Sequence, residues 1–196
     1  MVTALTNLLD DTGAGAGFYT TAMYYEALSA GQRGAASFIN KNNPTSPVLK
    51  SLLKEDTVTG GYSADLPGDF VAVNSATYAY DGSTYKPCKV VEYAEHLWNI
   101  ENPFLVNSKN RPVIYIKGES TLGGKYYFYP TNSSTSNGVL TYLAEVTDIA
   151  SGVDPVIKQG HDAMVQYALH YLLKRNKDEE RAKLAYSEFE RLASLL

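Results

Sequence analysis

The sequence lacks the features that define several common protein classes. It has a single cysteine, Cys88, so no internal disulfide can form and nothing indicates an oxidising compartment. No apolar run approaches the roughly 20 residues that cross a bilayer, and the first residues lack the basic and apolar stretches of a secretory signal. We therefore expect no membrane association and synthesis in the cytoplasm.

Positive charge is also scarce. Lysine and arginine total 17 against 21 aspartates and glutamates, which gives a net charge of −4. This balance disfavours a tight grip on nucleic acid, because neutralising phosphates needs a basic surface. Tyrosine, by contrast, is abundant at 16 residues and suits subunit contacts, since its ring buries area while its hydroxyl keeps a partner.

A glycine-rich stretch near the start, "TGAGAGFYT" over residues 12–20, resembles a phosphate-binding loop only superficially. The dinucleotide fingerprint needs a small residue where this chain has Phe18, and the other phosphate motif needs a lysine followed by serine or threonine. We therefore predict no cofactor here. The stretch is expected to be a turn that leads into a helix, with Thr20 or Thr21 as its N-cap.

Hydrophobic spacing predicts an α+β chain of 196 residues that forms a single domain. Its helical bundle combines an N-terminal helix with a C-terminal helical hairpin, and a β-rich antiparallel meander is inserted at residues 69–148. The predicted elements, in chain order, are a helix over 20–40, a short helix over 47–56, a loop over 57–69, a hairpin around Asp81-Gly82, a loop over 95–112, strands at 113–118, 124–130 and 138–146, a helix that begins at Asp154-Pro155, and a helix from Glu179.

The predicted helices make one specific packing arrangement testable. Apolar residues repeat at steps of three and four in both C-terminal helices, as expected for an antiparallel pair. We expect Phe189 to pack against Tyr167 and Tyr171 and against the first helix near Phe38. Glycines at positions 31 and 34 of that first helix indicate the close approach of another backbone.

No residue pattern indicates catalysis or a metal site. His161 and His170 are separated by about 900° around one helix and so face opposite sides, while His96 falls in a predicted loop beside Glu92 and Glu95 only. Cys88 has no motif around it and is expected to be a small core residue. The acidic pairs are what any chain with 21 acids offers, and they are Asp10 with Asp11, Glu92 with Glu95, and Glu179 with Glu180.

The order of these features resembles the head–tail adaptor, or connector ring, proteins of tailed bacteriophages, most nearly those of podovirus-like and crAss-like phages. The resemblance covers most of the chain and rests on "LTNLLDD", "YYEALSAGQRGAASFI", "ADLPGDF", "KYYFYPT", "GVLTYLAEV" and the closing "HDAMVQYALHYLLKRNKDEERAKLAYSEFERLASLL". The individual matching positions are Leu28, Gln32, Ala36, Asp162, Tyr167, Ala168, Ala182 and Phe189.

The resemblance implies a structural virion protein without enzyme activity. It implies a dodecameric ring beneath the portal at the head–tail junction, a DNA conduit through its centre, and a tail or second neck-ring protein below. By analogy with the family, we expect Leu192, Leu195 and Leu196 to enter a cleft between portal subunits. The alternative, that these leucines cap their own subunit's core, stays open. Tyr126 and Phe128 are further candidates for the portal or subunit interface.

Two other function classes remain possible on the residues alone. A virion-associated hydrolase of cell walls would need two acids in a cleft. A carbohydrate- or receptor-binding tail module is suggested by the aromatic strand residues 126–129 and by Trp98.

Overall fold

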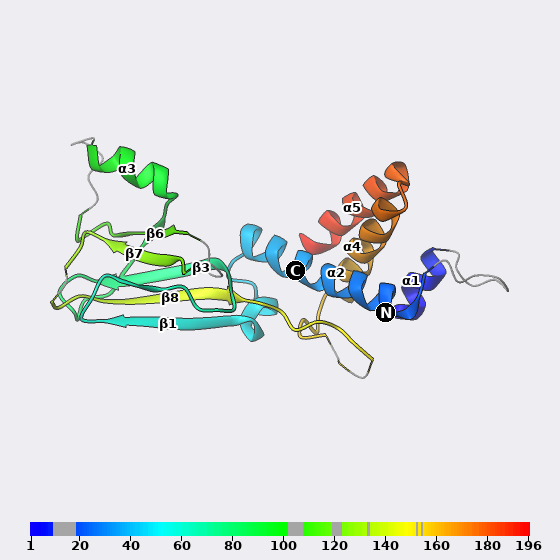
Figure 1. Ribbon diagram of the computed structural model, residues 1–196, viewed down its shortest axis with the longest axis horizontal. Coiled ribbons are helices and arrows are strands. Elements are labelled where there is room, and N and C mark those ends of the chain that lie inside the picture. The colour runs from blue at the N-terminus through cyan, green and yellow to red at the C-terminus, as the bar shows by residue number, and fades with distance from the viewer. Residues whose placement is uncertain (10–18, 102–107, 119–122, 133, 152, 154) are drawn as a thin grey trace. The chain divides into compact units, whose positions relative to one another are not determined.

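The computed structural model describes residues 1–9, 19–101, 108–118, 123–132, 134–151, 153 and 155–196 (Figure 1). The glycine-rich stretch up to Phe18, Asp10, Asp11 and Asp154 lie outside the described residues. The chain divides into two compact units, a helical unit of residues 1–52 and 145–196, and a β-rich unit of residues 53–144. The predicted α+β class is confirmed.

The described residues of the helical unit form four α-helices and one short 3-10 helix, named η1. The helices are α1 (Val2–Leu8), α2 (Thr21–Asn42), η1 (Pro47–Ser51), α4 (His161–Arg175) and α5 (Glu179–Ala193). Thr20 caps α2 as predicted, since its side chain accepts a hydrogen bond from the N–H of Met23. Asp178 caps α5 in the same way through the N–H of Arg181. The predicted helical hairpin is confirmed, with α4 and α5 side by side (Figure 1).

The start of α4 was predicted too early, at Asp154-Pro155. The helix begins at His161, after Gly160 in the left-handed conformation with φ of 79°. The backbone N–H groups of Val156 and Ile157 donate to Oε1 of the buried Gln32, at 2.7 and 3.2 Å. These two residues are thus bound to α2.

Small residues let α2 and α4 approach closely. A Cβ atom added to Gly31 would lie 2.3 Å from the carbonyl oxygen of Met164, so only glycine fits at this crossing. Phe189 on α5 is 1% exposed, with its ring centroid 5.3 Å from Phe38 and 5.0 Å from Tyr167. The predicted packing of Phe189 is therefore confirmed for these two partners, whereas the Tyr171 hydroxyl donates to Glu26.

In the β-rich unit, the described residues form two four-stranded sheets and one helix, α3 (Tyr93–Glu101). One sheet has the order β1 (Leu53–Thr59), β8 (Asn137–Ala144), β3 (Phe70–Ala79) and β4 (Lys86–Pro87). The other has the order β2 (Ser63–Asp65), β7 (Lys125–Tyr129), β6 (Val113–Lys117) and β5 (Lys89–Val90). Both sheets contribute to one apolar core, in which Tyr78 of β3 stacks on Phe128 of β7 with centroids 4.9 Å apart.

The strand order departs from the predicted meander. The hairpins β3–β4 and β6–β7 form as expected, but β8 does not pair with β7 and instead lies between β1 and β3. Two segments predicted as short helix and loop contain β1 and β2, and the segment predicted as loop-like carries α3. The β-rich unit therefore starts at residue 53, where the sequence placed the insertion at 69.

Candidate interaction surfaces

The C-terminal residues Leu192 and Leu196 are half-buried within the helical unit. A Cβ atom at Gly160 would lie 2.2 Å from Cδ1 of Leu196, so this leucine packs directly over the glycine backbone. The carbonyl oxygen of Leu196 accepts a hydrogen bond from the Ser46 hydroxyl at 2.6 Å. Leu196 is therefore attached to its own unit at two points.

Leu195 is 73% exposed, in contrast to its neighbour. Leu184 on α5 is 72% exposed, and Leu195 follows two residues after the end of α5 at Ala193. Between them, Arg191 donates two hydrogen bonds to the Glu188 carboxylate, at 2.6 and 2.8 Å, which lowers the pKa of Glu188. We call these four residues, Leu184, Glu188, Arg191 and Leu195, the α5 outer face. Its two apolar ends touch solvent, while its charges are paired.

Tyr126 and Phe128 do not lie at an interface. Both side chains are 0% exposed in the β-rich core, so neither can contact a partner chain. The Tyr126 hydroxyl donates to the Asp56 carboxylate at 2.8 Å, and burial raises the pKa of Tyr126. The alternation along β7 places Tyr127 and Tyr129 on the opposite face of the strand, where both are half-buried.

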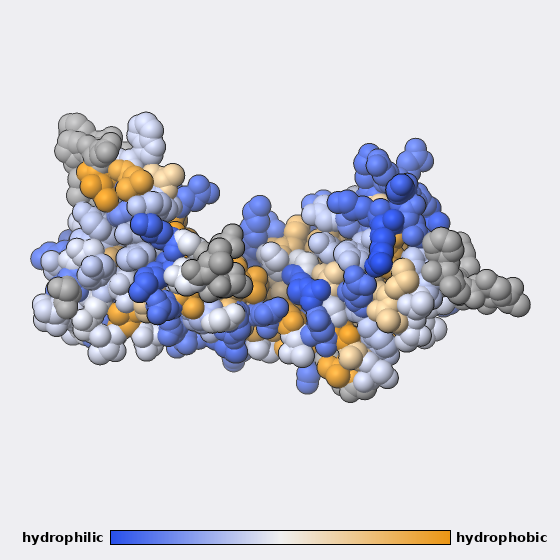
Figure 2. Space-filling model, viewed as in Figure 1, coloured by the Kyte–Doolittle hydropathy of each residue, from blue (hydrophilic) through white to orange (hydrophobic). Residues whose placement is uncertain are grey.

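Helix α3 carries an apolar surface that the sequence did not reveal. Leu97 and Ile100 are each 45% exposed and Trp98 is 77% exposed, and Figure 2 shows hydrophobic residues over this helix. The segment was predicted as a loop, and these apolar residues share a surface because the segment is a helix. An exposed apolar surface on a helix is typical of a protein that contacts other proteins.

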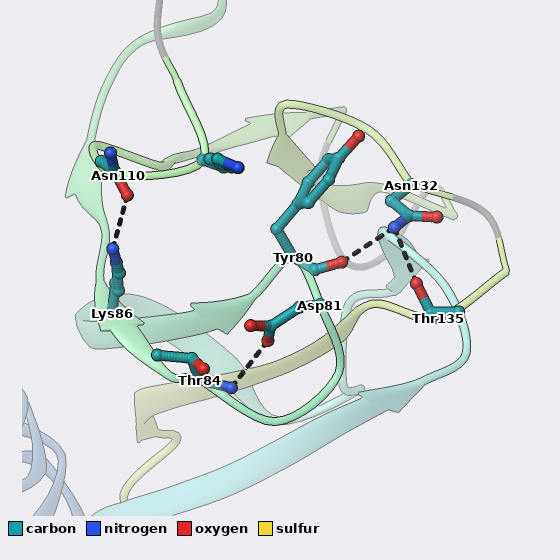
Figure 3. A pocket seen from close by; sticks show the side chains of 8 residues that line it. Tyr80, Asp81, Thr84, Lys86, Asn110, Asn132 and Thr135 are labelled. Carbon is teal, nitrogen blue, oxygen red and sulfur yellow. Dashed lines mark hydrogen bonds between the residues drawn. The ribbon is translucent and has the colours of Figure 1, made fainter.

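A polar pocket of about 500 Å³ opens where the β3–β4 turn, the residues before β6 and the β7–β8 connection meet (Figure 3). Its groups bind one another: Lys86 donates to Asn110 at 2.6 Å, and Asn132 donates to the Tyr80 carbonyl and to Thr135, both at 2.8 Å. The N–H groups of Thr84 and Ser83 lower the pKa of Asp81. These contacts hold three loops together.

The remaining candidates for chemistry are dispersed. Cys88 is half-buried against the β-rich core, and burial raises the pKa of its thiol to about 12. His161 is exposed, while His170 places Nδ1 2.8 Å from the Ala182 carbonyl. Glu95 pairs with Lys89 at 2.6 Å. Within the described part of the chain, no group of three or more histidines, cysteines or acids could hold a metal ion.

No helix among the described residues is long and apolar enough to cross a membrane. The exposed apolar residues of α3 and α5, each carried by a compact unit, suit the class of proteins that contact other proteins. A family model described as SU10 adaptor protein matches residues 5–196, and the chain therefore belongs to that family. It is a structural adaptor protein of bacteriophage virions. No curated protein is a significant match to the chain.

The family confirms the resemblance to phage adaptors that the sequence predicted. The assignment to podovirus-like or crAss-like phages stays a prediction.

Proposed function

We propose that this adaptor forms a dodecameric ring beneath the portal, at the head–tail junction, with its two units acting as a single adaptor domain. The ring is part of the DNA conduit and binds a tail or second neck-ring protein on its other side. The chain is made in the host cytoplasm and has no enzymatic role. Membership of an adaptor family supports association with other virion proteins.

The mildly acidic charge fits a conduit through which DNA slides. A basic lumen would hold the duplex, because each neutralised phosphate releases counterions and adds affinity. With a net charge of −4, the chain has no excess of cations for such a grip.

The observation that carries the proposal is the contrast between Leu195 and Leu196. Leu196 is attached through Gly160 and Ser46, so this residue is held in place before any partner arrives. Its neighbour Leu195 is presented to solvent, with 73% of the residue exposed. Burying one leucine in a partner contributes about 1.5–3 kcal/mol, and a ring repeats the contact in every subunit.

We therefore propose that Leu195, supported by Leu192 and Leu196, enters a cleft between portal subunits. A deletion of Ser194–Leu196 would not test Leu195 alone, because it would also remove the contacts of Leu196 with Ser46 and Gly160. Leu195→Ser removes only the exposed side chain.

The experiment is co-sedimentation of the adaptor with purified portal rings. Leu195→Ser should lower the affinity for the portal ring by at least about tenfold, which corresponds to roughly 1.4 kcal/mol per subunit. Leu184→Ser is the matched control, because it removes an equally exposed leucine from the middle of α5, eleven residues before Leu195. Wild-type binding by Leu195→Ser would contradict the docking proposal. Native mass measurement of the complex counts the subunits, and a number other than the dodecamer would contradict the ring.

A further inference from the structure

Helix α3 is attached to its sheet in an unusual way. Its apolar residues Leu97, Trp98 and Ile100 face solvent, whereas its buried side chain is His96, which is 3% exposed. In the part of the chain that the structure describes, Nδ1 of His96 is the sole buried side-chain nitrogen or oxygen without a hydrogen-bond partner. Such an orphaned polar atom is costly and needs an explanation.

His96 contacts aromatic rings instead of hydrogen-bond acceptors. Its ring stacks on Tyr115 of β6, with centroids 4.0 Å apart and planes at 20°, and meets the edge of Tyr129 of β7 at 5.0 Å. Tyr115 in turn stacks on Tyr127 at 5.2 Å. We call Tyr115, Tyr127 and Tyr129 the tyrosine face. Tyr93, at the start of α3, also lies on Tyr115, with centroids 5.6 Å apart.

The surroundings of His96 suit a neutral imidazole. A second proton would turn both ring nitrogens into donors, while Nδ1 has no acceptor within reach. The tyrosine rings attract a cation only weakly in comparison with the water that burial removes. Burial accordingly lowers the pKa of His96.

Among the residues that the structure describes, no neighbouring carboxylate offsets that effect. On α3 itself, Glu95 is engaged with Lys89 of β5 at 2.6 Å. Just before α3, the exposed Glu92 accepts a hydrogen bond from the His96 N–H through its backbone carbonyl, at 2.9 Å. From β6, Lys117 adds a positive charge 5.3 Å from the centroid of the Tyr93 ring. The tyrosine face completes the described groups that surround His96 from β6 and β7, and burial raises the pKa of Tyr115, the ring on which His96 stacks.

We propose that α3 is a pH-controlled latch: neutral His96 holds the helix on the tyrosine face, and protonation releases it and exposes that face. The direction follows from linkage. A released His96 titrates near its ordinary value of 6.5, and the docked His96 titrates lower. Docking is therefore at full strength above about pH 6.5, and it weakens as the pH falls from there through the lowered pKa, by at most about tenfold per pH unit.

The experiment compares hydrogen exchange of the α3 amides at about pH 7.5 and about pH 5, corrected for the intrinsic rates. The wild-type protein should lose protection in α3, by at most about tenfold for each pH unit below 6.5, while β6 and β7 stay protected. Trp98 is the only tryptophan, so a fall in its fluorescence anisotropy reports release of the same helix.

Two variants identify the group responsible. His96→Phe keeps the stacking and cannot be protonated, so its α3 should stay protected at both pH values. His161→Phe is the matched control, because this exposed histidine lies in the helical unit, and it should leave the pH effect unchanged. Unchanged wild-type protection between the two pH values overturns the latch. An equal loss of protection in His96→Phe overturns it as well.

A measurement on the wild-type chain keeps the test decisive if His96→Phe fails to fold. NMR titration of the three histidines gives the pKa of His96 directly. A value below 6.5 together with loss of α3 protection supports the latch, and a value at or above 6.5 overturns it.

Discussion

Phe189 offers the sharpest test of the helical unit. Replacing it with alanine removes a ring that is 1% exposed and touches Phe38 and Tyr167 at centroid distances of 5.3 and 5.0 Å. Buried Phe→Ala substitutions cost about 3–5 kcal/mol through lost burial and the cavity left behind. A surface groove of about 420 Å³ already reaches Phe189, so water can enter the cavity. We therefore expect a loss near the lower limit, about 3 kcal/mol.

The assay is urea unfolding followed by two signals. Far-UV circular dichroism reports mainly on the helices, while Trp98 fluorescence reports on the β-rich unit, where the only tryptophan lies. Phe189→Ala should shift the helical transition to lower urea without changing its slope. A matching shift in the Trp98 signal would indicate that both units unfold together, as the proposed single domain requires.

The size of the Phe189→Ala effect, compared with that of a control, tests the packing of Phe189. A decrease in the free energy of unfolding below about 1 kcal/mol would refute the conclusion that Phe189 packs tightly against α2 and α4. Tyr186→Ala serves as the control, because this ring lies 5.6 Å from Phe189 but is 37% exposed, so its removal should cost clearly less.

Three further substitutions test other contacts. Gly31→Ala should separate α2 from α4, because the added Cβ would overlap the Met164 carbonyl. The free energy of unfolding, measured in urea, should fall by about 1–3 kcal/mol. Tyr126→Phe should cost about 1.5 kcal/mol by the same measurement, because it removes a hydrogen bond to the half-exposed Asp56 carboxylate. The Lys54 ammonium holds the pKa of Asp69 below its ordinary 3.8. The ionised Asp69 therefore stabilises the fold fully above about pH 3.8, and this stabilisation is lost as the pH falls through the lowered pKa. Asp69→Asn should flatten this part of the acid-unfolding profile, and an unchanged profile would contradict the assignment.

Elements with strong local signals were predictable from the sequence. Helix α2 has its N-cap at Thr20, and α4 and α5 have apolar residues at steps of three and four, so local spacing sufficed. The turn at Asp81-Gly82 was also predictable, because the dipeptide favours a positive φ and Gly82 adopts 79°.

Elements that depend on distant partners were not predictable. Strand β1 shows little alternation and has Val58 as its one buried residue, and it becomes a strand because β8 supplies its hydrogen bonds from the far end of the unit. Helix α3 buries a histidine and exposes its apolar residues, which inverts the usual pattern. Tyr126 and Phe128 could not be placed from the sequence, because alternation separates the two faces of β7 but does not indicate which face meets the core.

The buried Gln32 has a consequence for the chemical durability of the helical unit. Its Nε2 donates to the Thr147 carbonyl at 3.0 Å, while its Oε1 accepts from the N–H groups of Val156 and Ile157. The amide supplies a donor and an acceptor at one end of the side chain, whereas an ionised carboxylate supplies acceptors alone. Deamidation to glutamate would replace the donor with a second acceptor that faces the Thr147 carbonyl. A single hydrolysis would therefore break the hydrogen bond that ties Thr147 to α2. At 1% exposure, Gln32 is shielded from the water that such ageing requires.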